Sequence, residues 1–400
     1  MTRSPLPRPS HDFSGVPVVA FSSNDWSDIP SSTSHLMRQL ARSRTVLYID
    51  TIGIRTPRLT GRDARRALDK LRRALSGARR VDRNLYVWSP IVIPLHGSGT
   101  ARRLNAGLLG FLTRRVMQRL GMRSPIVYVA LPSALDAVTQ LPRTALVYHC
   151  VDDYREFTGA PRAAYRSMED RLVRLADLTV VSSPRLLELR KEGARSIVYI
   201  PHGVDLEWFE GFLESDVVLP DLDGLANPIA GFVGRIGDWI DLDLVCRCAQ
   251  EMPGWSFVIV GPTNVDLERY AGFSNLVFLG PKPHEDIPHY IKRFSVGLLP
   301  FVDNDVSASV NPLKLYEYLA VGKPVVSTTS LDMSEFADVV EVARPDDFPA
   351  AIRAAHEADT PERGEARRRF VSNYSWESIA DRLVGALEGA VAAQQQSRER

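Results

Sequence analysis

Short apolar runs rich in β-branched residues alternate with segments of helical spacing along most of the chain. The first half predicts strands at Val16–Ser22, Val46–Asp50, Leu85–Ser89, Ile126–Ala130, Ala145–Cys150, Leu178–Val181 and Ile197–Ile200. The second half predicts strands at Ile229–Val233, Phe257–Val260, Leu276–Leu279, Val296–Leu299 and Val325–Ser327. Because strands that alternate with helices form βαβ units, the pattern predicts an α/β protein built on parallel sheets.

The two sets of strands are separated by a segment with the composition of a linker. Within residues 213–228 the chain reads ESDVVLPDLDGLANP, which is rich in Pro, Gly, Asp and Asn. A chain of 400 residues also exceeds the size at which single hydrophobic cores usually stop growing. We therefore expect Rossmann-like domains over residues 1–212 and 229–374, followed by a C-terminal helix and tail over residues 375–400.

Composition narrows the class of protein. The chain is 44% apolar with a net charge of +1, which is typical of a globular protein and argues against nucleic-acid binding by the protein as a whole. Cys150, Cys246 and Cys248 fit neither a disulfide framework nor the usual zinc spacing, so we expect reduced packing residues. The chain has no run of 18 apolar residues and its N-terminus has no apolar targeting segment, which predicts a cytoplasmic protein.

One segment of the second half predicts a helix with charged side chains near its start. A turn at Asn311-Pro312 begins the helix, and Gly322 ends it. Lys314 and Glu317 are three residues apart, so they share a face near the free N–H groups of the helix N-terminus. Such a face could bind a nucleoside diphosphate, with the carboxylate on the ribose and the lysine on the phosphates. The alternative is a surface ion pair.

A second feature is a series of strands that end in Gly or Pro. The strand from Ile229 continues to Gly234 and Arg235, and the next strand ends at Gly261. The carboxyl ends of parallel strands meet at one edge of a sheet, where open α/β folds bind ligands. Backbone can therefore approach a diphosphate closely, and Arg235 could bind it with a planar guanidinium, although most surface arginines are only solvated.

Together these segments resemble the nucleotide-sugar signature of the retaining family 4 glycosyltransferases, particularly bacterial members that build capsular, exopolysaccharide and teichuronic-type polymers. The resemblance covers about residues 178–330 well, and the preceding part by general architecture only. It implies the GT-B fold, in which two Rossmann-like domains face each other across a cleft and the C-terminal helix crosses back to the N-terminal domain.

The resemblance also implies roles for single residues. Glu317 matches the second of two family glutamates, which holds the donor ribose, whereas Ser309 stands at the position of the first. Arg235 matches the Gly-Arg phosphate loop, and Ile240 stands where the family has a partner lysine, so Lys314 is expected to replace it. Lys282 lies in the loop that receives the base through backbone groups. The expected donor site consists of Gly234, Arg235, Gly261, Lys282, Asn311, Pro312, Leu313, Lys314 and Glu317.

Two loops of the first half are candidates for the acceptor side. His149, Asp152 and Asp153 follow a buried strand, at a place where the family has an acceptor-domain His or Asp; a satisfied core histidine is the alternative for His149. Asp25 and Trp26 follow the first strand and could bind sugar hydroxyls and a pyranose face. Capping of the next helix by nearby serines would explain the same loop. The expected acceptor site is Asp25, Trp26 and His149.

The resemblance implies transfer with retention of configuration and without a protein nucleophile. Arg235 and Lys314 would stabilise the departing diphosphate. The expected catalytic residues are His149, Asp152, Asp153, Arg235 and Lys314. No Asp-x-Asp pair stands in a plausible metal loop, so we expect neither a metal nor a cofactor beside the nucleotide diphosphate sugar. A nucleotide-sugar 2-epimerase and a non-catalytic GT-B binding protein are the alternative functions.

The segment Arg55–Arg123 is strongly basic, with 17 Lys and Arg against three Asp and no Glu, a net formal charge of +14. Residues 61–80 and 101–120 also show helical spacing of apolar residues. Basic amphipathic helices of this type bind anionic membrane surfaces, although a solvated basic face is the alternative. Nucleic acid is not expected, because no aromatic stacking pattern accompanies the charge. We expect a glycan or lipid-linked acceptor and a peripheral position at the inner face of the plasma membrane.

Overall fold

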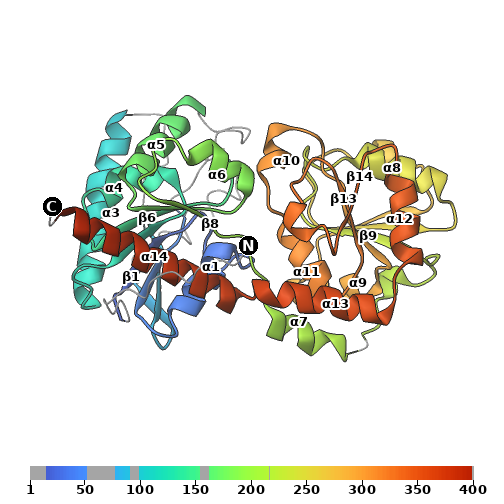
Figure 1. The fold of residues 1–400 in the computed structure, drawn as a ribbon, viewed down its shortest axis with the longest axis horizontal. Helices are drawn as coiled ribbons and strands as arrows, with labels where there is room; N and C mark the ends of the chain where they lie inside the picture. Colours follow the sequence, from blue (N-terminus) through green and yellow to red (C-terminus); the bar gives the residue numbers. More distant parts are fainter. Residues whose placement is uncertain (1–14, 52–76, 91–98, 154–161, 216, 399–400) are drawn as a thin grey trace. The chain divides into compact units, whose positions relative to one another are not determined.

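The computed structural model describes residues 15–51, 77–90, 99–153, 162–215 and 217–398. Their contacts divide the chain into two compact units (Figure 1). Unit 1 comprises Met1–Ile200 and Ile379–Arg400, and unit 2 comprises Pro201–Ser378. The end of the chain therefore belongs to the unit that contains its beginning.

The sheet of unit 1 has the strand order β3-β4-β2-β1-β5-β6-β7-β8. All neighbours are parallel except β3 and β4, which pair antiparallel. From β4 onward the order is that of doubly wound folds, with a switch point between β1 and β5. The strands are β1 (Val18–Phe21), β2 (Val46–Ile49), β3 (Arg79–Asp82), β4 (Leu85–Trp88), β5 (Ile126–Val129), β6 (Ala145–Cys150), β7 (Leu178–Val181) and β8 (Ile197–Tyr199).

Helices surround this sheet and bury its central strands. Every residue of β1, β2, β5, β6 and β7 is buried, which explains why these strands are continuous apolar runs without alternation. The described helices are α1 (Ser32–Leu40), α3 (Gly99–Arg119), α4 (Leu135–Val138), α5 (Arg162–Leu175), α6 (Pro184–Arg190) and, from Ile379 onward, α14 (Trp376–Arg398), with the 3-10 turn η1 (Pro132–Ala134).

The sheet of unit 2 is entirely parallel, in the order β11-β10-β9-β12-β13-β14. This is again the doubly wound order, and its switch point lies between β9 and β12. The strands are β9 (Ile229–Val233), β10 (Ser256–Val260), β11 (Leu276–Gly280), β12 (Val296–Leu299), β13 (Val325–Thr328) and β14 (Glu341–Ala343).

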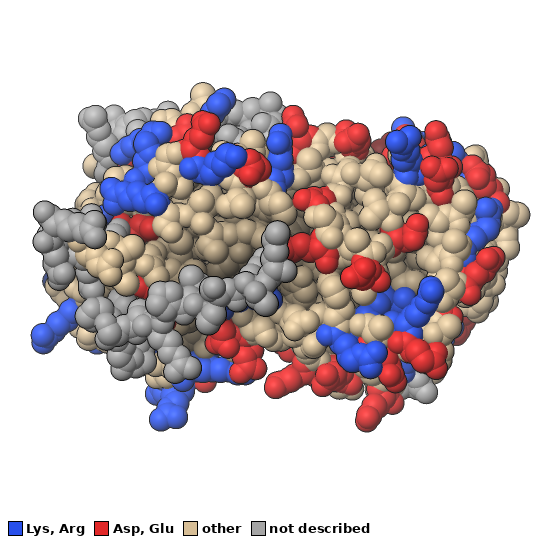
Figure 2. All heavy atoms as spheres, viewed as in Figure 1, with Lys and Arg blue, Asp and Glu red and all other residues tan. Residues whose placement is uncertain are grey.

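Unit 2 has more short helical turns than unit 1 among the described residues. Its helices are α7 (Leu206–Leu213), α8 (Leu242–Glu251), α9 (Ile287–Arg293), α10 (Asp305–Ser309), α11 (Leu313–Val321), α12 (Phe348–Glu357) and α13 (Pro361–Val371). Its 3-10 turns are η2 (Pro220–Leu222), η3 (Glu268–Tyr270), η4 (His284–Asp286), η5 (Ser334–Phe336) and η6 (Ser372–Tyr374). In the face shown in Figure 2, basic and acidic side chains are interspersed over this unit.

The segment with linker composition packs into unit 2. Leu219 and Leu222 are buried in its core, and Asp221 between them binds Tyr290. The contact boundary instead falls between Ile200 and Pro201. Composition alone missed this packing, because two buried leucines are enough to fix a segment that is otherwise rich in turn-forming residues.

Two further sequence expectations can be compared with the structure. All three cysteines are buried with free thiols. Among the helices that the structure describes, none is both long and apolar enough to cross a membrane. Of the basic segment, residues 55–76 and 91–98 lie outside the described residues.

Candidate functional site

The carboxyl ends of β9 and β10 meet in a contact that requires glycine. Gly234 and Gly261 have φ values of +156° and +146°, which L side chains rarely adopt. A Cβ atom on Gly261 would lie 1.8 Å from the carbonyl oxygen of Gly234. The N–H of Gly234 donates to Val260 (2.9 Å), and that of Gly261 donates to Gly280 (2.9 Å). The edge of the sheet is thus formed by closely spaced backbone that a ligand can approach.

Arg235 follows directly at this edge and is exposed. Its guanidinium makes no ion pair with any residue that the structure describes. The positive charge is therefore available to an anion, although the same exposure fits the alternative of a solvated arginine.

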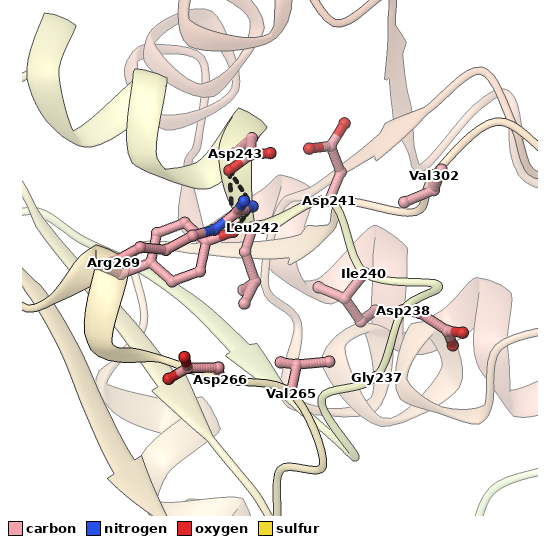
Figure 3. A pocket seen from close by; sticks show the side chains of 11 residues that line it. Gly237, Asp238, Ile240, Asp241, Leu242, Asp243, Val265, Asp266, Arg269 and Val302 are labelled. Atoms are coloured by element: carbon pink, nitrogen blue, oxygen red, sulfur yellow. Dashed lines mark hydrogen bonds and ion pairs between the residues drawn. The ribbon is translucent and has the colours of Figure 1, made fainter.

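A cavity of about 390 Å³ lies beside this edge (Figure 3). Its lining comes from the loop after β9 and the start of α8, from the loop after β10 and the turn η3, and from Val302 after β12. Figure 3 shows Asp241 and Val302 along one rim, with Val265 and Asp266 along the other. β9 and β12 flank the switch point, where open α/β sheets bind ligands, but none of the donor-site residues expected from the sequence lines this cavity.

One wall of this cavity is closed by Arg269. Its Nη2 atom lies 2.5 Å from Oδ1 of Asp243, and the hydroxyl of Tyr270 donates to the same oxygen at 2.9 Å. Both members of the ion pair are largely exposed. The pair therefore contributes little to stability and can rearrange when a ligand enters.

The loop from β9 to α8 is fixed by backbone hydrogen bonds to the loop after β12. The N–H of Asp241 donates to Pro300 (2.7 Å), and that of Val302 donates to Trp239 (2.9 Å). Ile240 is buried in the core, so the position of the family's partner lysine is occupied by a packing residue. Trp239 also packs on the core and covers Gly237, where a Cβ atom would lie 2.5 Å from the indole.

Helix α11 begins and ends where the sequence predicts. Pro312 precedes it without a side-chain cap, and Gly322 ends it with a φ of +83°. Nζ of Lys314 lies 2.7 Å from each carboxylate oxygen of Glu317, so the ion pair that the sequence left open as the alternative is formed. Ser309, at the place of the first family glutamate, is buried and donates to the Asp305 carbonyl (3.0 Å).

Asn311 and Leu313 flank the start of this helix. Oδ1 of Asn311 accepts a hydrogen bond from the Tyr316 hydroxyl (2.9 Å), which fixes the turn before α11. Leu313 is partly buried as the first residue of the helix.

An aromatic pair that the sequence did not reveal lies close to the ion pair. The rings of Trp208 and His284 stack at 4.7 Å with an interplanar angle of 19°. Burial lowers the pKa of His284, Glu317 opposes this shift and Lys314 adds to it. His284 is therefore near both charges. Trp208 lies on α7, 76 positions earlier in the sequence, so only the fold brings it here.

The side chain of Lys282 forms an ion pair with Asp221. Its Nζ atom lies 2.5 Å from Oδ2 of Asp221, which also accepts the hydroxyl of Tyr290 at 2.8 Å. Burial alone would raise the pKa of Asp221, but Lys282 and Tyr290 lower it. Lys282 thus ties the loop after β11 to the segment before β9, and only its backbone remains for a base.

In unit 1, the three candidates at the end of β6 occupy different environments. His149 lies within the strand, is 2% exposed and shares a hydrogen bond with the hydroxyl of Tyr128, which matches the alternative of a core histidine. Asp153 is buried and accepts from Arg190 Nη2 at 2.9 Å. Asp152 is partly exposed, and burial, with Asp153 beside it, raises its pKa to about 6. Asp152 is therefore a titratable group at this edge.

A buried ionic network lies behind Asp152. Arg190 Nη2 also lies 3.0 Å from Oε2 of Glu169, and the hydroxyl of Tyr148 donates to Oε1 of Glu169 at 2.7 Å. Both side chains of the Arg190–Glu169 pair are almost fully buried. The sequence did not predict this network, because its members come from separate elements.

The loop after β1 is tied to β2. The N–H of Trp26 donates to Oδ1 of Asp50 (2.7 Å), and Oδ1 of Asp25 accepts from the N–H of Thr51 (3.1 Å). The indole of Trp26 contacts the ring of Tyr48, and the guanidinium of Arg38 lies 4.5 Å over it. Ser31 caps α1, so the capping explanation is correct for the end of this loop.

Comparison with known proteins identifies unit 2. Residues 227–357 match the family model described as glycosyl transferases group 1. Unit 2 therefore contains a glycosyl transferase group 1 domain. The resemblance noted in the sequence is confirmed for this part of the chain.

One curated relative is the putative teichuronic acid biosynthesis glycosyltransferase TuaH of Bacillus subtilis (strain 168). It is 30% identical over 240 residues, which cover 56% of this chain and 59% of the relative. The match thus spans about three fifths of the length of that protein.

Solved structures that are similar over 93–94% of the chain show its fold. A sucrose-phosphate synthase from Thermosynechococcus elongatus is similar with a TM-score of 0.68 at 16% identity, covering 94% of this chain and 100% of that one. HepE of Anabaena, in complex with UDP, has a TM-score of 0.62 at 14% identity, with 94% and 100% covered. A trehalose-6-phosphate protein from E. coli bound with UDP-2-fluoro glucose has a TM-score of 0.65 at 12% identity. That match covers 93% of this chain and 99% of the other. The expected GT-B fold is confirmed.

Proposed function

We propose that the protein is a glycosyltransferase that moves a sugar from a nucleotide diphosphate sugar to a glycan or lipid-linked glycan acceptor in cell-surface polysaccharide synthesis. The observation that carries this proposal is the glycine-built edge of unit 2, with Arg235 beside it, inside a segment that matches the group 1 family model. Two of the similar structures are described as complexes with UDP or a UDP-sugar, and the curated relative is described as a putative teichuronic acid enzyme.

The donor is bound by unit 2 in this proposal. Arg235 and the uncapped N-terminus of α11 bind the diphosphate, because both offer N–H donors and positive potential. Glu317 binds the ribose. Its carboxylate has about four acceptor sites, so the hydroxyls can use those that Lys314 leaves open.

Lys314 changes partner when the donor arrives. In the structure it neutralises Glu317, and with a diphosphate nearby it can contact a phosphate oxygen while staying on the same helix face. Together with Arg235 it stabilises the charge that develops on the leaving diphosphate. We expect no need for a divalent metal, because these groups supply the positive charge. Retention of configuration is expected from the resemblance to the retaining family.

On the acceptor side, Asp152 is the residue that we assign to an acceptor hydroxyl. With a pKa of about 6 it is mostly ionised at neutral pH and can accept a hydrogen bond from that hydroxyl. The leaving diphosphate oxygen then takes the proton. Asp25 and Trp26 are assigned to the acceptor glycan, and Asp153 to holding the loop through Arg190.

A product assay separates this proposal from its alternatives. The purified protein is incubated with UDP-, GDP-, ADP- and dTDP-sugars, with and without a soluble acceptor analogue, and products are identified by NMR. A new glycosidic bond supports transfer, whereas inversion at C2 without transfer would show an epimerase. Saturable nucleotide binding without any product would show a binding protein.

A matched pair of variants tests the donor assignment in the same experiment. Glu317→Gln should weaken nucleotide binding about tenfold by calorimetry, since a ribose hydroxyl loses a charged acceptor. Glu357→Gln is the control, because Glu357 is exposed at the end of α12, outside the assigned site. Equal affinities for the two variants would refute the ribose assignment.

A further inference from the structure

Helix α3 exposes a row of large apolar side chains. Leu104 is 60% exposed, Leu108 42% and Phe111 57%. Their spacing of four and three residues puts them on one face of the helix. The other face packs on unit 1 through Leu109, Val116 and Met117, among others. The outward row is therefore additional to the apolar face that the fold itself needs.

This row differs from the other exposed apolar residues that the structure describes. Ile29, Val217, Val218 and Val342 are dispersed over loops and one edge strand. Single exposed apolar residues are ordinary in soluble proteins. Three large side chains in a row on one helix are instead typical of an interaction surface.

The same helix is basic. The sequence of α3 contains five arginines and no Asp or Glu. Arg115 and Arg119 continue the exposed face one and two turns beyond Phe111, and the guanidinium of Arg115 lies 5.4 Å over the Phe111 ring. Arg114 beside them donates to the carbonyl of Gln140 and so helps to hold α3 on α4.

We propose that this face, formed by Leu104, Leu108, Phe111, Arg115 and Arg119, docks on an anionic lipid bilayer. The three apolar side chains would enter the boundary between headgroups and acyl chains, while the guanidinium groups bind lipid phosphates. Leu104 and Arg119 are about 22 Å apart along the helix axis at 1.5 Å per residue, so the helix would lie flat on the surface.

Charge decides between a bilayer and other occupants. A surface without a carboxylate on its helix complements a continuous negative surface, and the apolar row suits lipid rather than nucleic acid, where it would stay in water. The reason for such docking rests on the proposed function, since an enzyme with a lipid-linked acceptor has to reach that acceptor at a membrane. The binding itself depends only on α3.

Vesicle sedimentation tests the proposal with the full chain. Vesicles of phosphatidylcholine alone are compared with vesicles that also contain phosphatidylglycerol, at low and high salt. The parent protein should bind the anionic vesicles and be released by salt. Leu108→Gln with Phe111→Gln, and separately Arg115→Glu with Arg119→Glu, should each lower the bound fraction at least tenfold. Val218→Gln is the matched control, because Val218 is 76% exposed on unit 2.

The outcomes separate this inference from the proposed function. Transfer to a soluble acceptor analogue is measured for every variant and should remain within twofold of the parent. Intact transfer with no binding to anionic vesicles would overturn docking and leave the function standing. Vesicle binding without transfer would support docking and overturn the proposed function. Self-association that the Leu108 and Phe111 substitutions abolish, without vesicle binding, would instead show a contact between copies of the chain.

Discussion

The two sheets share one topology but end differently at their carboxyl edges. In unit 2, β9 and β10 run into Gly234 and Gly261, so that the edge consists of backbone. In unit 1, β1 and β2 run into Ser22 and Asp50, which are buried and bonded to neighbouring side chains. The edge of unit 2 therefore offers main-chain groups to a ligand, whereas these side chains at the edge of unit 1 are used within the fold. Both glycines lie within residues 227–357, the part of the chain that matches the family model.

The charges of the two units differ in the same way. Arg235 in unit 2 is exposed and the Lys314–Glu317 pair is partly exposed, so both can meet a ligand at small cost. Arg190, Asp153 and Glu169 in unit 1 are buried together. A buried network of this kind fixes a loop rather than binding a solute, because removal of one member leaves the others as unpaired charges. The charges of this network in unit 1 are thus used within the fold, next to Asp152, whereas those of Arg235 and the Lys314–Glu317 pair in unit 2 are open to the proposed donor.

The largest expected effect comes from filling the glycine contact. Gly261→Ala should lower the free energy of unfolding of unit 2 by at least about 4 kcal/mol, because its Cβ would overlap the Gly234 carbonyl at a φ of +146°. Gly254→Ala is the control, since a Cβ there meets nothing within 4 Å. Urea unfolding monitored by fluorescence measures both. Similar midpoints would mean that the edge is not constrained by backbone contact.

The buried network should show the next largest effect. Arg190→Met should lower the free energy of unfolding by about 3 kcal/mol, because it leaves Asp153 and Glu169 buried without their cation. Arg171→Met removes an exposed partner of Asp136 and should cost less than about 1 kcal/mol. Equal losses in thermal or urea unfolding would contradict the contrast between a buried network and surface charges.

The sequence predicted the central strands of both sheets because these are buried on both sides and form continuous apolar runs. It missed β3 and β14, which are short edge strands with mostly exposed residues and no apolar pattern. The bounds of α11 followed from Pro312 and Gly322, which are local signals. The contacts of Trp208 with His284 and of Arg190 with Asp153 could not be predicted, since they join residues far apart in the chain.

Removal of the exposed cation in unit 2 should affect turnover rather than stability. Arg235→Ala should lower kcat by about a hundredfold, as expected when a donor to the developing charge is lost, and should change the unfolding free energy by less than about 0.5 kcal/mol. Arg269→Ala is the comparison within the same unit, because Arg269 already pairs with Asp243 across the cavity. A kcat within twofold of the parent would exclude Arg235 from the leaving-group site.

The smallest effect, and the most specific to unit 1, concerns Asp152. Its pKa in the folded protein, about 6, is above that of an exposed aspartate, because burial and Asp153 disfavour the ionised form. The folded state therefore binds this proton more tightly than the unfolded state, and the resulting stabilisation is present at low pH and lost as pH rises through about 6. Asp152→Asn should remove this loss of stability at high pH, because asparagine does not ionise.

The Asp152→Asn variant should accordingly have a free energy of unfolding about 1 kcal/mol above that of the parent at pH 8, and the same free energy near pH 4. The gain is smaller than the full pKa shift of Asp152 would give, because the side chain is partly exposed. Transfer should fall in this variant, and the parent's kcat should decline below about pH 6 as the carboxylate is protonated. Urea unfolding at several pH values and a pH–rate profile measure the two. A variant with parental kcat and the same gain in stability would show that Asp152 takes no part in the transfer.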